Sequence, residues 1–171
     1  MTVPRSSPST SSGRNSVKPS QADAPIGRTD AEILARFQSS RNQPSGSRTL
    51  GFHLVAVSQA DKTVEVAFDA RAELLLNPMK QIQGGYLCAM LDECMSVACM
   101  VASGMTHVAP TIEMKTSFFR PGAPGALRGI GRVVKWGRTF AFTEGELYDA
   151  EGRLLAKATG TAAPTPFKTY K

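Results

Sequence analysis

Two adjacent glycines and a carboxylate, Gly84, Gly85 and Asp92, lie in one apolar segment with the sequence GGYLCAMLDECM. Apolar side chains nearly all round this segment predict a buried helix from Gly85 to about Ala102. Glycines at a helix N-terminus let a ligand approach unpaired amide N–H groups, and those groups favour negative charge. An oxyanion hole requires this arrangement. The pattern therefore indicates a site that stabilises negative charge developing on a carbonyl oxygen.

Asp92 adds a candidate base. A carboxylate inside an apolar helix is destabilising unless it is paired, solvated or protonated, and Asp92 lies too far from the helix start for the helix dipole to explain it. Each feature alone has a structural alternative: Asp92 could bond a backbone amide at a subunit seam, and the glycines could serve a sharp bend. Its neighbour Glu93 points about 100° away and is expected to reach solvent. The combination favours catalysis.

The spacing of these residues predicts a shared site. Gly84 and Asp92 are eight residues apart, which is about 12 Å along a helix at 1.5 Å per residue. A carbonyl held at Gly84 is therefore out of reach of Asp92 in the same chain. Two such helices running antiparallel about a two-fold axis would bring Gly84 of one chain to Asp92 of the other. On this hypothesis a monomer is inactive.

Helices and strands flank the central helix. Thr29 is expected to cap a short helix that ends near Asn42, with Glu32 completing a capping box, and a Pro-Ser-Gly loop follows. Alternating apolar residues predict two strands within residues 50–70, joined by a turn at 59–61. Four further strands are expected at His107–Phe119, Leu127–Lys135, Thr139–Tyr148 and Leu154–Ala162. Tight turns join the last three, with Gly137 and Gly152 able to take positive φ.

This order of elements predicts an α+β fold in which a mostly antiparallel sheet wraps around one central helix. The 171 residues are enough for one domain with a sizeable core. Residues 1–27 are rich in Ser and Pro and are expected to form a disordered tail. The remaining divisions are an N-terminal helix and loop (28–47), the main domain (48–164) and a C-terminal tail (165–171).

The net charge of +6 is concentrated at the two ends of the chain. The first 28 residues hold four basic residues and one acidic residue (4 − 1 = +3), and Lys168 and Lys171 add two more charges. The main domain is therefore close to neutral. With a single Trp and no basic body, the chain is not expected to bind nucleic acid.

Cys88, Cys94 and Cys99 share the central segment, where a helix would keep them from bridging one another. The sequence has no CxxC pair, and its two histidines are isolated, so neither a zinc site nor another metal site is expected. The cysteines are expected to be small buried hydrophobes of a reducing compartment. No uninterrupted apolar run reaches the roughly 18 residues of a membrane span, and the N-terminus lacks the apolar core of a secretory signal. A cytoplasmic protein with no membrane contact is expected.

Three stretches of the sequence resemble a known family: NPMKQIQGGYLCAMLD, PTIEMKTSFFRPG and VVKWGRTFAFTEGELYDAEGRLLAKATGT. They resemble the hotdog-fold acyl-CoA thioesterases, in particular the phenylacetate-degradation (PaaI-like) type, and the resemblance extends over roughly residues 48–164. The resemblance implies a hotdog fold and hydrolysis of an acyl-CoA thioester to free acid and coenzyme A, without a cofactor. It also implies self-association into dimers or tetramers with shared active sites.

The resemblance assigns roles to individual residues. The Gly84 amide would polarise the thioester carbonyl, and the adjacent Gly85 would contribute to substrate binding. Asp92 of the partner chain would act as general base or nucleophile. Asn77 would bind or orient the thioester, and Thr111 would help to hold the water. The hairpin residues Lys135, Gly137 and Arg138 correspond to a region that contacts coenzyme A phosphates, with an alternative as a solvated hairpin tip. Candidate walls of the acyl pocket, each with an alternative place in the ordinary core, are Tyr86, Met90, Phe118 and Phe119.

The sequence departs from the family motif at two positions. Lys80 replaces the usual Gly, and Gln83 replaces the usual His. Gln still donates and accepts hydrogen bonds, so it could position water or the thioester. It does not transfer a proton near neutral pH, which leaves acid–base chemistry to Asp92.

The same motif leaves a second function open, that of a non-catalytic acyl-CoA-binding domain acting as a sensor. The Gly84 amides would then hold a thioester without cleaving it, and the missing His is compatible with this. A hydratase or dehydratase of acyl-CoA is a weaker third hypothesis. Related enzymes of that kind usually place an Asp and a His together, and neither His53 nor His107 lies near the motif.

Overall fold

The computed structural model describes residues 28–40 and 43–169 of the chain. The expected tail over residues 1–27 lies outside the described residues. The helices are α1 (Asp30–Ser39), α2 (Ser45–Leu50), α3 (Ala72–Leu75), α4 (Gly84–Ala102) and the 3-10 turn η1 (Phe167–Thr169). The strands are β1 (Phe52–Ser58), β2 (Thr63–Ala70), β3 (His107–Val108), β4 (Thr111–Phe118), β5 (Gly125–Trp136), β6 (Ala141–Tyr148), β7 (Leu154–Ala162) and β8 (Thr165–Pro166).

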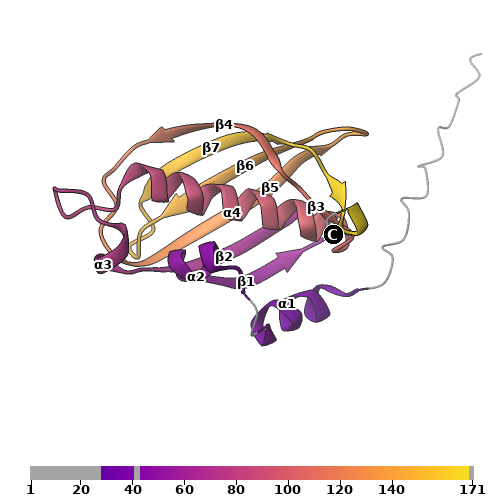
Figure 1. Ribbon diagram of the computed structural model, residues 1–171, viewed down its shortest axis with the longest axis horizontal. Coiled ribbons are helices and arrows are strands. Elements are labelled where there is room, and N and C mark those ends of the chain that lie inside the picture. Colours follow the sequence, from indigo (N-terminus) through magenta and orange to yellow (C-terminus); the bar gives the residue numbers. More distant parts are fainter. Residues whose placement is uncertain (1–27, 41–42, 170–171) are drawn as a thin grey trace, which may run out of the picture.

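A six-stranded sheet wraps around α4 (Figure 1). The strand order is β1-β2-β5-β6-β7-β4, and every neighbouring pair is antiparallel. Strands β1 and β4 are the two edges of the sheet. This arrangement confirms the predicted α+β hotdog fold with a central helix.

Several local expectations need correction. The expected Pro-Ser-Gly loop contains α2. The strand expected over residues 107–119 is divided into β3 and β4, because Pro110 lacks the N–H that would continue the ladder. Gly152 has the expected positive φ of 78°, whereas Gly137 does not. Gly137 is needed for space instead, since a Cβ there would lie 2.8 Å from the carbonyl oxygen of Phe140.

The helix α1 begins as the capping box predicts. The Glu32 amide donates to Thr29 Oγ1 over 3.3 Å, and the Thr29 amide donates to Glu32 Oε2 over 2.7 Å. Ile33 of α1 is fully buried, and the Phe37 ring lies 6.4 Å from that of Phe52. The apolar side of α1 is thereby attached to the outer edge of the sheet at β1.

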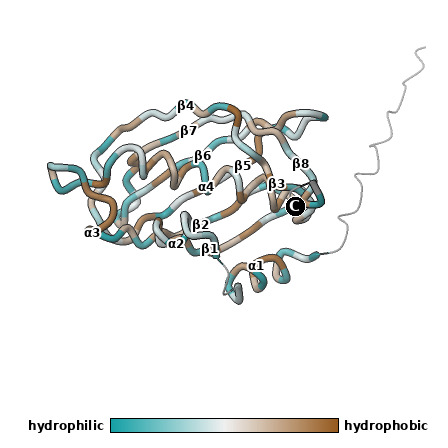
Figure 2. Tube along the Cα trace, in the orientation of Figure 1, coloured by the Kyte–Doolittle hydropathy of each residue, from teal (hydrophilic) through white to brown (hydrophobic). Residues whose placement is uncertain are grey.

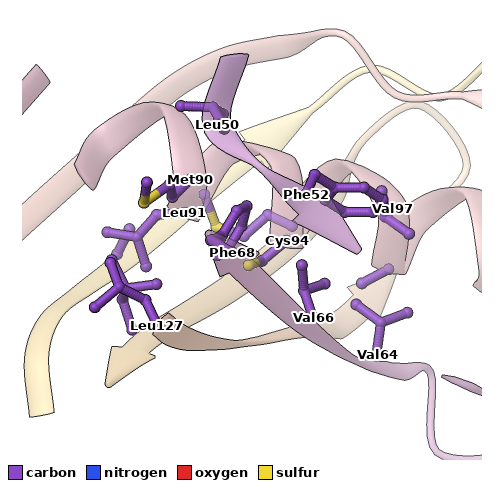
Figure 3. Packing of buried hydrophobic residues seen from close by; sticks show 14 of the residues in the cluster. Leu50, Phe52, Val64, Val66, Phe68, Met90, Leu91, Cys94, Val97 and Leu127 are labelled. Atoms are coloured by element: carbon purple, nitrogen blue, oxygen red, sulfur yellow. The ribbon is translucent and has the colours of Figure 1, made fainter. Parts of the chain in front are cut away.

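The hydrophobic core lies between α4 and the inner face of the sheet. Hydropathy changes repeatedly along the strands (Figure 2), and in β2 the residues Val64, Val66 and Phe68 are buried in alternation with more exposed neighbours. They pack against Met90, Leu91, Cys94 and Val97 of α4 (Figure 3). Removing such apolar area from water is the main favourable contribution to folding.

Glycines on three strands let α4 lie close to the sheet. We call Gly129, Gly131, Gly145 and Gly160 the glycine track. A Cβ at Gly131 would lie 2.0 Å from the carbonyl oxygen of Cys94, and a Cβ at Gly129 would lie 2.5 Å from the Cys94 sulfur. A side chain at Gly131 would require the helix backbone to move, and a side chain at Gly129 would displace the Cys94 sulfur.

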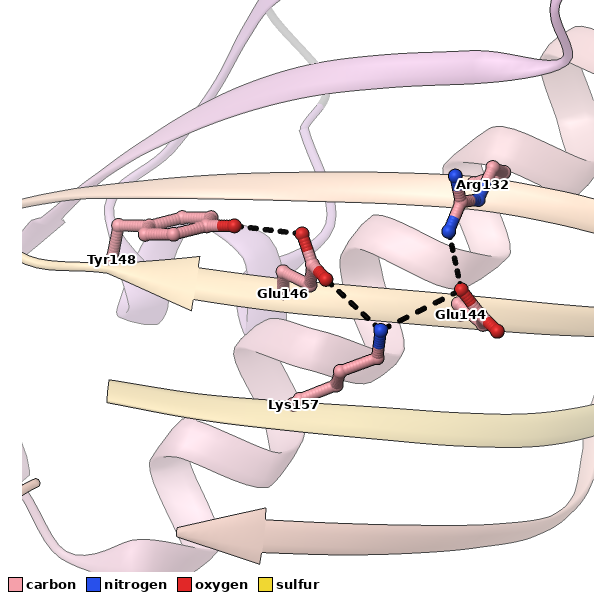
Figure 4. A network of polar contacts seen from close by, with 5 residues as sticks. All are labelled: Arg132, Glu144, Glu146, Tyr148 and Lys157. Atoms are coloured by element: carbon pink, nitrogen blue, oxygen red, sulfur yellow. Dashed lines mark hydrogen bonds and ion pairs between the residues drawn. The ribbon is translucent and has the colours of Figure 1, made fainter. Parts of the chain in front are cut away.

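A network of polar side chains lies on the outer face of β5, β6 and β7. Lys157 lies 3.0 Å from Glu146 and 3.7 Å from Glu144, and Glu144 also pairs with Arg132 (Figure 4). The Tyr148 hydroxyl donates to Glu146 over 2.7 Å. Partly exposed ion pairs of this kind contribute little stability each.

By length and composition alone, α4 is apolar enough to cross a membrane. The helix passes this test although no uninterrupted apolar run is long enough, because the test admits Asp92 and Glu93 among the apolar residues. Half of its most apolar window is buried within the domain. The helix therefore has the burial of a core helix wrapped by its own sheet.

Candidate active site

The helix α4 begins at Gly84, one residue earlier than expected, with Gln83 as its N-cap. The amides of Tyr86 and Leu87 donate to the carbonyl of Gln83. Among the described residues, no acceptor is found for the amides of Gly84 and Gly85. Two unpaired N–H groups at the positive end of a helix can stabilise an oxyanion, so this end of α4 has the donors that the sequence predicted.

An open hollow of about 340 Å³ lies beside the first of these two residues, Gly84. Its lining is mostly apolar and consists of Ile82, Gly84, Leu87, Phe118, Phe119, Arg120, Pro121 and Gly122. The expected wall residues Phe118 and Phe119 are among them. Met90 is fully buried, so it belongs to the ordinary core, which was the alternative to a place in the pocket wall. Tyr86 is half-buried and packs against that core.

Sequence reasoning missed Arg120 and its neighbours in this hollow. Residues 120–122 follow β4 after Phe119, and their Pro-Gly pair indicates a turn. No local pattern shows that this turn meets the start of α4. The Ile82 amide donates to the Gly122 carbonyl over 2.8 Å, which ties the two segments together. One Arg120 guanidinium nitrogen donates to the carbonyl of Leu154.

The fold brings Thr111, the residue expected from the resemblance to hold the water, into contact with Asp92. The Thr111 hydroxyl, at the first residue of β4, donates to Asp92 Oδ1 over 2.5 Å. Asp92 is half-buried and Thr111 is exposed, so the carboxylate is oriented by its neighbour and still open to solvent on one side. A hydrogen bond of this kind fixes which oxygen remains available to a water or a substrate.

The neighbouring carboxyl, Glu93, does not reach freely into solvent as expected. It is half-buried, and the buried Ser47 of α2 donates its hydroxyl to Glu93 Oε1 over 2.7 Å. Burial raises the pKa of Glu93, while the hydrogen bond from Ser47 acts in the opposite direction. Glu93 therefore joins α2 to α4 and faces a different element from Asp92.

Within one chain, Gly84 and Asp92 remain separated as predicted. Both lie on the unbroken 19-residue helix α4, so their eight-residue spacing keeps them about 12 Å apart. Cys88 lies midway between them, and its sulfur is 3.6 Å from the Thr116 hydroxyl of β4. We call Gly84, Cys88 and Asp92 the α4 stripe, because residues four apart share one side of a helix.

Asn77 has a structural role in the loop before α4. Its side-chain oxygen accepts from the amides of Met79 (2.9 Å) and Gln81 (3.1 Å). The side-chain oxygen of Asn77, a residue expected to bind or orient the thioester, is thus occupied by the chain's own backbone. The side-chain nitrogen of Asn77 forms no hydrogen bond within the described segments.

Lys80 occupies a position that suits glycine. Its φ is 59°, a left-handed conformation that strains a residue with a Cβ. The glycine of the family motif is therefore explained by backbone geometry, and Lys80 adopts the same turn at some cost. Gln83 is exposed at the helix start, and its side chain forms no capping hydrogen bond.

The basic hairpin residues lie at the other end of α4. Lys135 and Arg138 are exposed at the junction of β5 and β6. The adjacent Trp136 ring lies 6.0 Å from that of His107, and His107 belongs to β3, which follows the C-terminal end of α4. The fold therefore does not bring Lys135, Gly137 and Arg138 to the Gly84 end of the same chain.

Comparisons with known proteins identify the family. A model of the thioesterase superfamily matches residues 81–156. A protein of Thermoplasma volcanium, provisionally described as an esterase, is 34% identical over 79 residues, which cover 46% of this chain and 59% of that relative. The match thus spans less than two thirds of the relative's length.

Solved structures extend the likeness. A protein of Ralstonia eutropha, provisionally described as a thioesterase related to phenylacetic acid degradation, is 32% identical, with a TM-score of 0.67, over 76% of this chain and 98% of that one. A Streptococcus mutans protein solved with bound acetyl-CoA is 24% identical, with a TM-score of 0.58, over 67% of this chain and 89% of its own. The second likeness shows the fold alone. From the family model and the Ralstonia protein, the chain belongs to the thioesterase superfamily, among its PaaI-like members with the hotdog fold.

Proposed function

We propose that this protein hydrolyses an acyl-CoA thioester to a free acid and coenzyme A, in a site shared by two chains. The observation that carries the proposal is the pair of unpaired Gly84 and Gly85 amides at the start of α4, of which Gly84 lines an apolar hollow. Family membership supports thioester hydrolysis in general. The choice of coenzyme A rests on the motif resemblance and on the related fold that was solved with acetyl-CoA.

In the proposed reaction, the thioester carbonyl oxygen accepts hydrogen bonds from the Gly84 and Gly85 amides. Asp92 of the second chain takes a proton from a water molecule, and the resulting hydroxide attacks the carbonyl carbon. The oxyanion that forms is stabilised by the two amides. It collapses with cleavage of the C–S bond, and the thiolate leaves as coenzyme A. A direct attack by the carboxylate, forming a mixed anhydride that water then hydrolyses, is the alternative course.

Other residues would assist from both chains. Thr111 holds the Asp92 carboxylate in one orientation, and the exposed Gln83 lies close enough to the helix start to orient a thioester or a water. Antiparallel α4 helices would carry the Lys135–Arg138 hairpin of one chain toward the Gly84 end of the other. There it could contact the phosphates of coenzyme A.

The first test compares release of free thiol by wild type and Asp92→Asn on a panel of aliphatic and aromatic acyl-CoAs. The Asn side chain still accepts from Thr111 but is not a base, so we expect turnover to fall by about 10²–10⁴-fold, the usual contribution of a general base. Asp69→Asn, at an exposed carboxylate on β2, is the matched control and should retain wild-type turnover.

Two results would change the assignment. Turnover by Asp92→Asn close to that of wild type would remove Asp92 from the reaction. Absence of thiol release by wild type, together with acyl-CoA binding in calorimetry, would favour the acyl-CoA sensor, for which the exposed Gln83 in place of a proton-transferring His is the relevant observation.

A further inference from the structure

Small residues line the side of α4 next to the edge strand β4, where Cys88 lies near Thr116 and Asp92 is bonded to Thr111. Gly85 and Ala89 are exposed, and Gly84, Cys88, Asp92 and Ser96 are half-buried, whereas the large residues of the helix point into the core. Small side chains let another helix approach closely, because little volume separates the two backbones. Cys88 is at the centre of this surface, four residues from each end of the α4 stripe.

The neighbouring strand is also suited to meet a second chain. Strand β4 is an edge of the sheet, and apolar side chains on it and just beyond it, Ile112, Phe118 and Phe119, are each more than half exposed. An unpaired edge with exposed apolar residues is a usual place for association. The occupant we infer is a second copy of this chain, because the proposed site is incomplete without Asp92 from that copy.

The symmetry of the shared site then determines which residues meet at the axis. Suppose that Gly84 of one chain faces Asp92 of the other across a two-fold axis. Facing residues on the two antiparallel helices then lie at equal distances, in opposite directions, from position 88, which is midway between 84 and 92. Residue 88 of one chain therefore faces residue 88 of the other. In an isologous interface, only a residue at the axis contacts its own copy in this way.

We propose that Cys88 lies on the two-fold axis of a dimer, where its small side chain sets the distance between the two α4 helices and so the width of both thioester sites. This inference rests on the proposed function for its register. Cys88 is a positioning residue on this account: it does not touch the reacting atoms, but it determines how far Asp92 of one chain lies from the Gly84 amide of the other.

A charge-swap experiment tests the position at the axis. Cys88→Asp and Cys88→Lys each place like charges against their own copy, so each variant alone should self-associate at least about tenfold more weakly than wild type. Co-expression of the two should restore dimers that contain one chain of each, detected by native mass spectrometry. Ala35→Asp and Ala35→Lys, on the exposed side of α1, are the matched controls and should dimerise as wild type.

The outcomes separate this inference from the proposed function. Dimers of Cys88→Asp as tight as wild type, or mixed chains that pair no better than either alone, would overturn the position of Cys88 at the axis even if wild type is an active thioesterase. If the charge-swap variants behave as expected but wild type releases no thiol, Cys88 would still lie at the axis, and the proposed hydrolase activity would be wrong.

Side-chain size at residue 88 tests the effect on the sites. We expect Cys88→Ser, of nearly equal volume, to retain kcat, and Cys88→Leu to lower kcat by about 10²-fold, because a misplacement near 1 Å has that effect. Ala35→Leu is the control for added bulk. Wild-type kcat in Cys88→Leu, in a dimer confirmed by mass, would overturn the claim that residue 88 sets the width of the sites.

Discussion

At the scale of single residues, the Gly84 amide can be removed without removing the helix. Proline is well tolerated at the first helical position, where its missing N–H has no helical partner. Gln83, with φ −63° and ψ 138°, already has the extended conformation that a residue before proline prefers. Gly84→Pro is therefore a deletion of one N–H at an otherwise compatible site.

We expect Gly84→Pro to lower kcat by about 10²–10³-fold, the usual effect of losing one oxyanion donor. Gly84→Ala is the matched comparison, since it also adds a Cβ, 3.4 Å from the Phe118 ring, but keeps the N–H. Steady-state thiol release from the best acyl-CoA, with circular dichroism to confirm the fold, measures both variants. Equal kcat values for Pro and Ala would show that this amide does not stabilise the transition state.

At the scale of elements, the contact between α2 and α4 depends on a carboxyl with a raised pKa. Because burial raises the pKa of Glu93 in the folded protein, the folded state binds this proton more tightly than the unfolded chain does. The resulting stabilisation is complete below the ordinary pKa of 4.5 and is lost as the pH rises through the folded pKa.

Glu93→Gln should remove this pH dependence while keeping an oxygen that accepts from Ser47. The free energy of unfolding of Glu93→Gln relative to wild type is therefore expected to increase from about pH 4 to pH 8, measured by urea denaturation. Ser47→Ala should have the opposite effect and steepen the loss, because the Ser47 hydrogen bond lowers the pKa of Glu93. A constant difference between Glu93→Gln and wild type across this range would contradict the assignment.

Elements with strong local signals were predictable from the sequence. The capping box at Thr29, the alternation in β2 and the apolar run of α4 each depend on neighbouring residues, and all three predictions are confirmed. Elements that depend on tertiary contacts were not. The six residues of α2 are too few to form a stable helix alone, and they pack on α4 through Ser47 and the buried Leu50.

The candidate site divides in the same way. The unpaired amides at the start of α4 and the separation of Gly84 from Asp92 followed from the sequence. The resemblance gave Thr111 a role with water but not its hydrogen bond to Asp92. The loop role of Asn77 and the place of Arg120 in the hollow did not follow from the sequence, since both depend on how the loop before α4 and the segment after β4 fold back. The left-handed turn at Lys80 could not be predicted either, because lysine, unlike glycine, gives no sequence signal for a positive φ.

At the scale of the whole molecule, sharing of sites can be tested by mixing two inactive variants. In a dimer of one Asp92→Asn chain and one Gly84→Pro chain, one site has both substitutions and the other has neither. Random pairing at equal amounts gives half mixed dimers, each with one of two sites intact, so about a quarter of wild-type activity should return.

The recovered activity is measured as thiol release after the two chains are denatured and refolded together, with each variant refolded alone as control. A site built within one chain predicts no recovery, because every chain in the mixture then carries a damaged site. Recovery above the sum of the separately refolded variants supports a site that spans two chains.

The glycine track has a consequence for changing the substrate range of this protein. Gly129 and Gly131 let α4 lie so close to the sheet that neither position has room for a Cβ. The distance between the helix and the sheet therefore cannot be changed gradually by substitutions on these strands. Libraries that vary the inner strands would mostly lose folded protein. Variation is better directed to the segment after β4, where Phe119, Arg120 and Pro121 line the hollow without supporting the helix, so that new acyl groups can be selected on an unchanged frame.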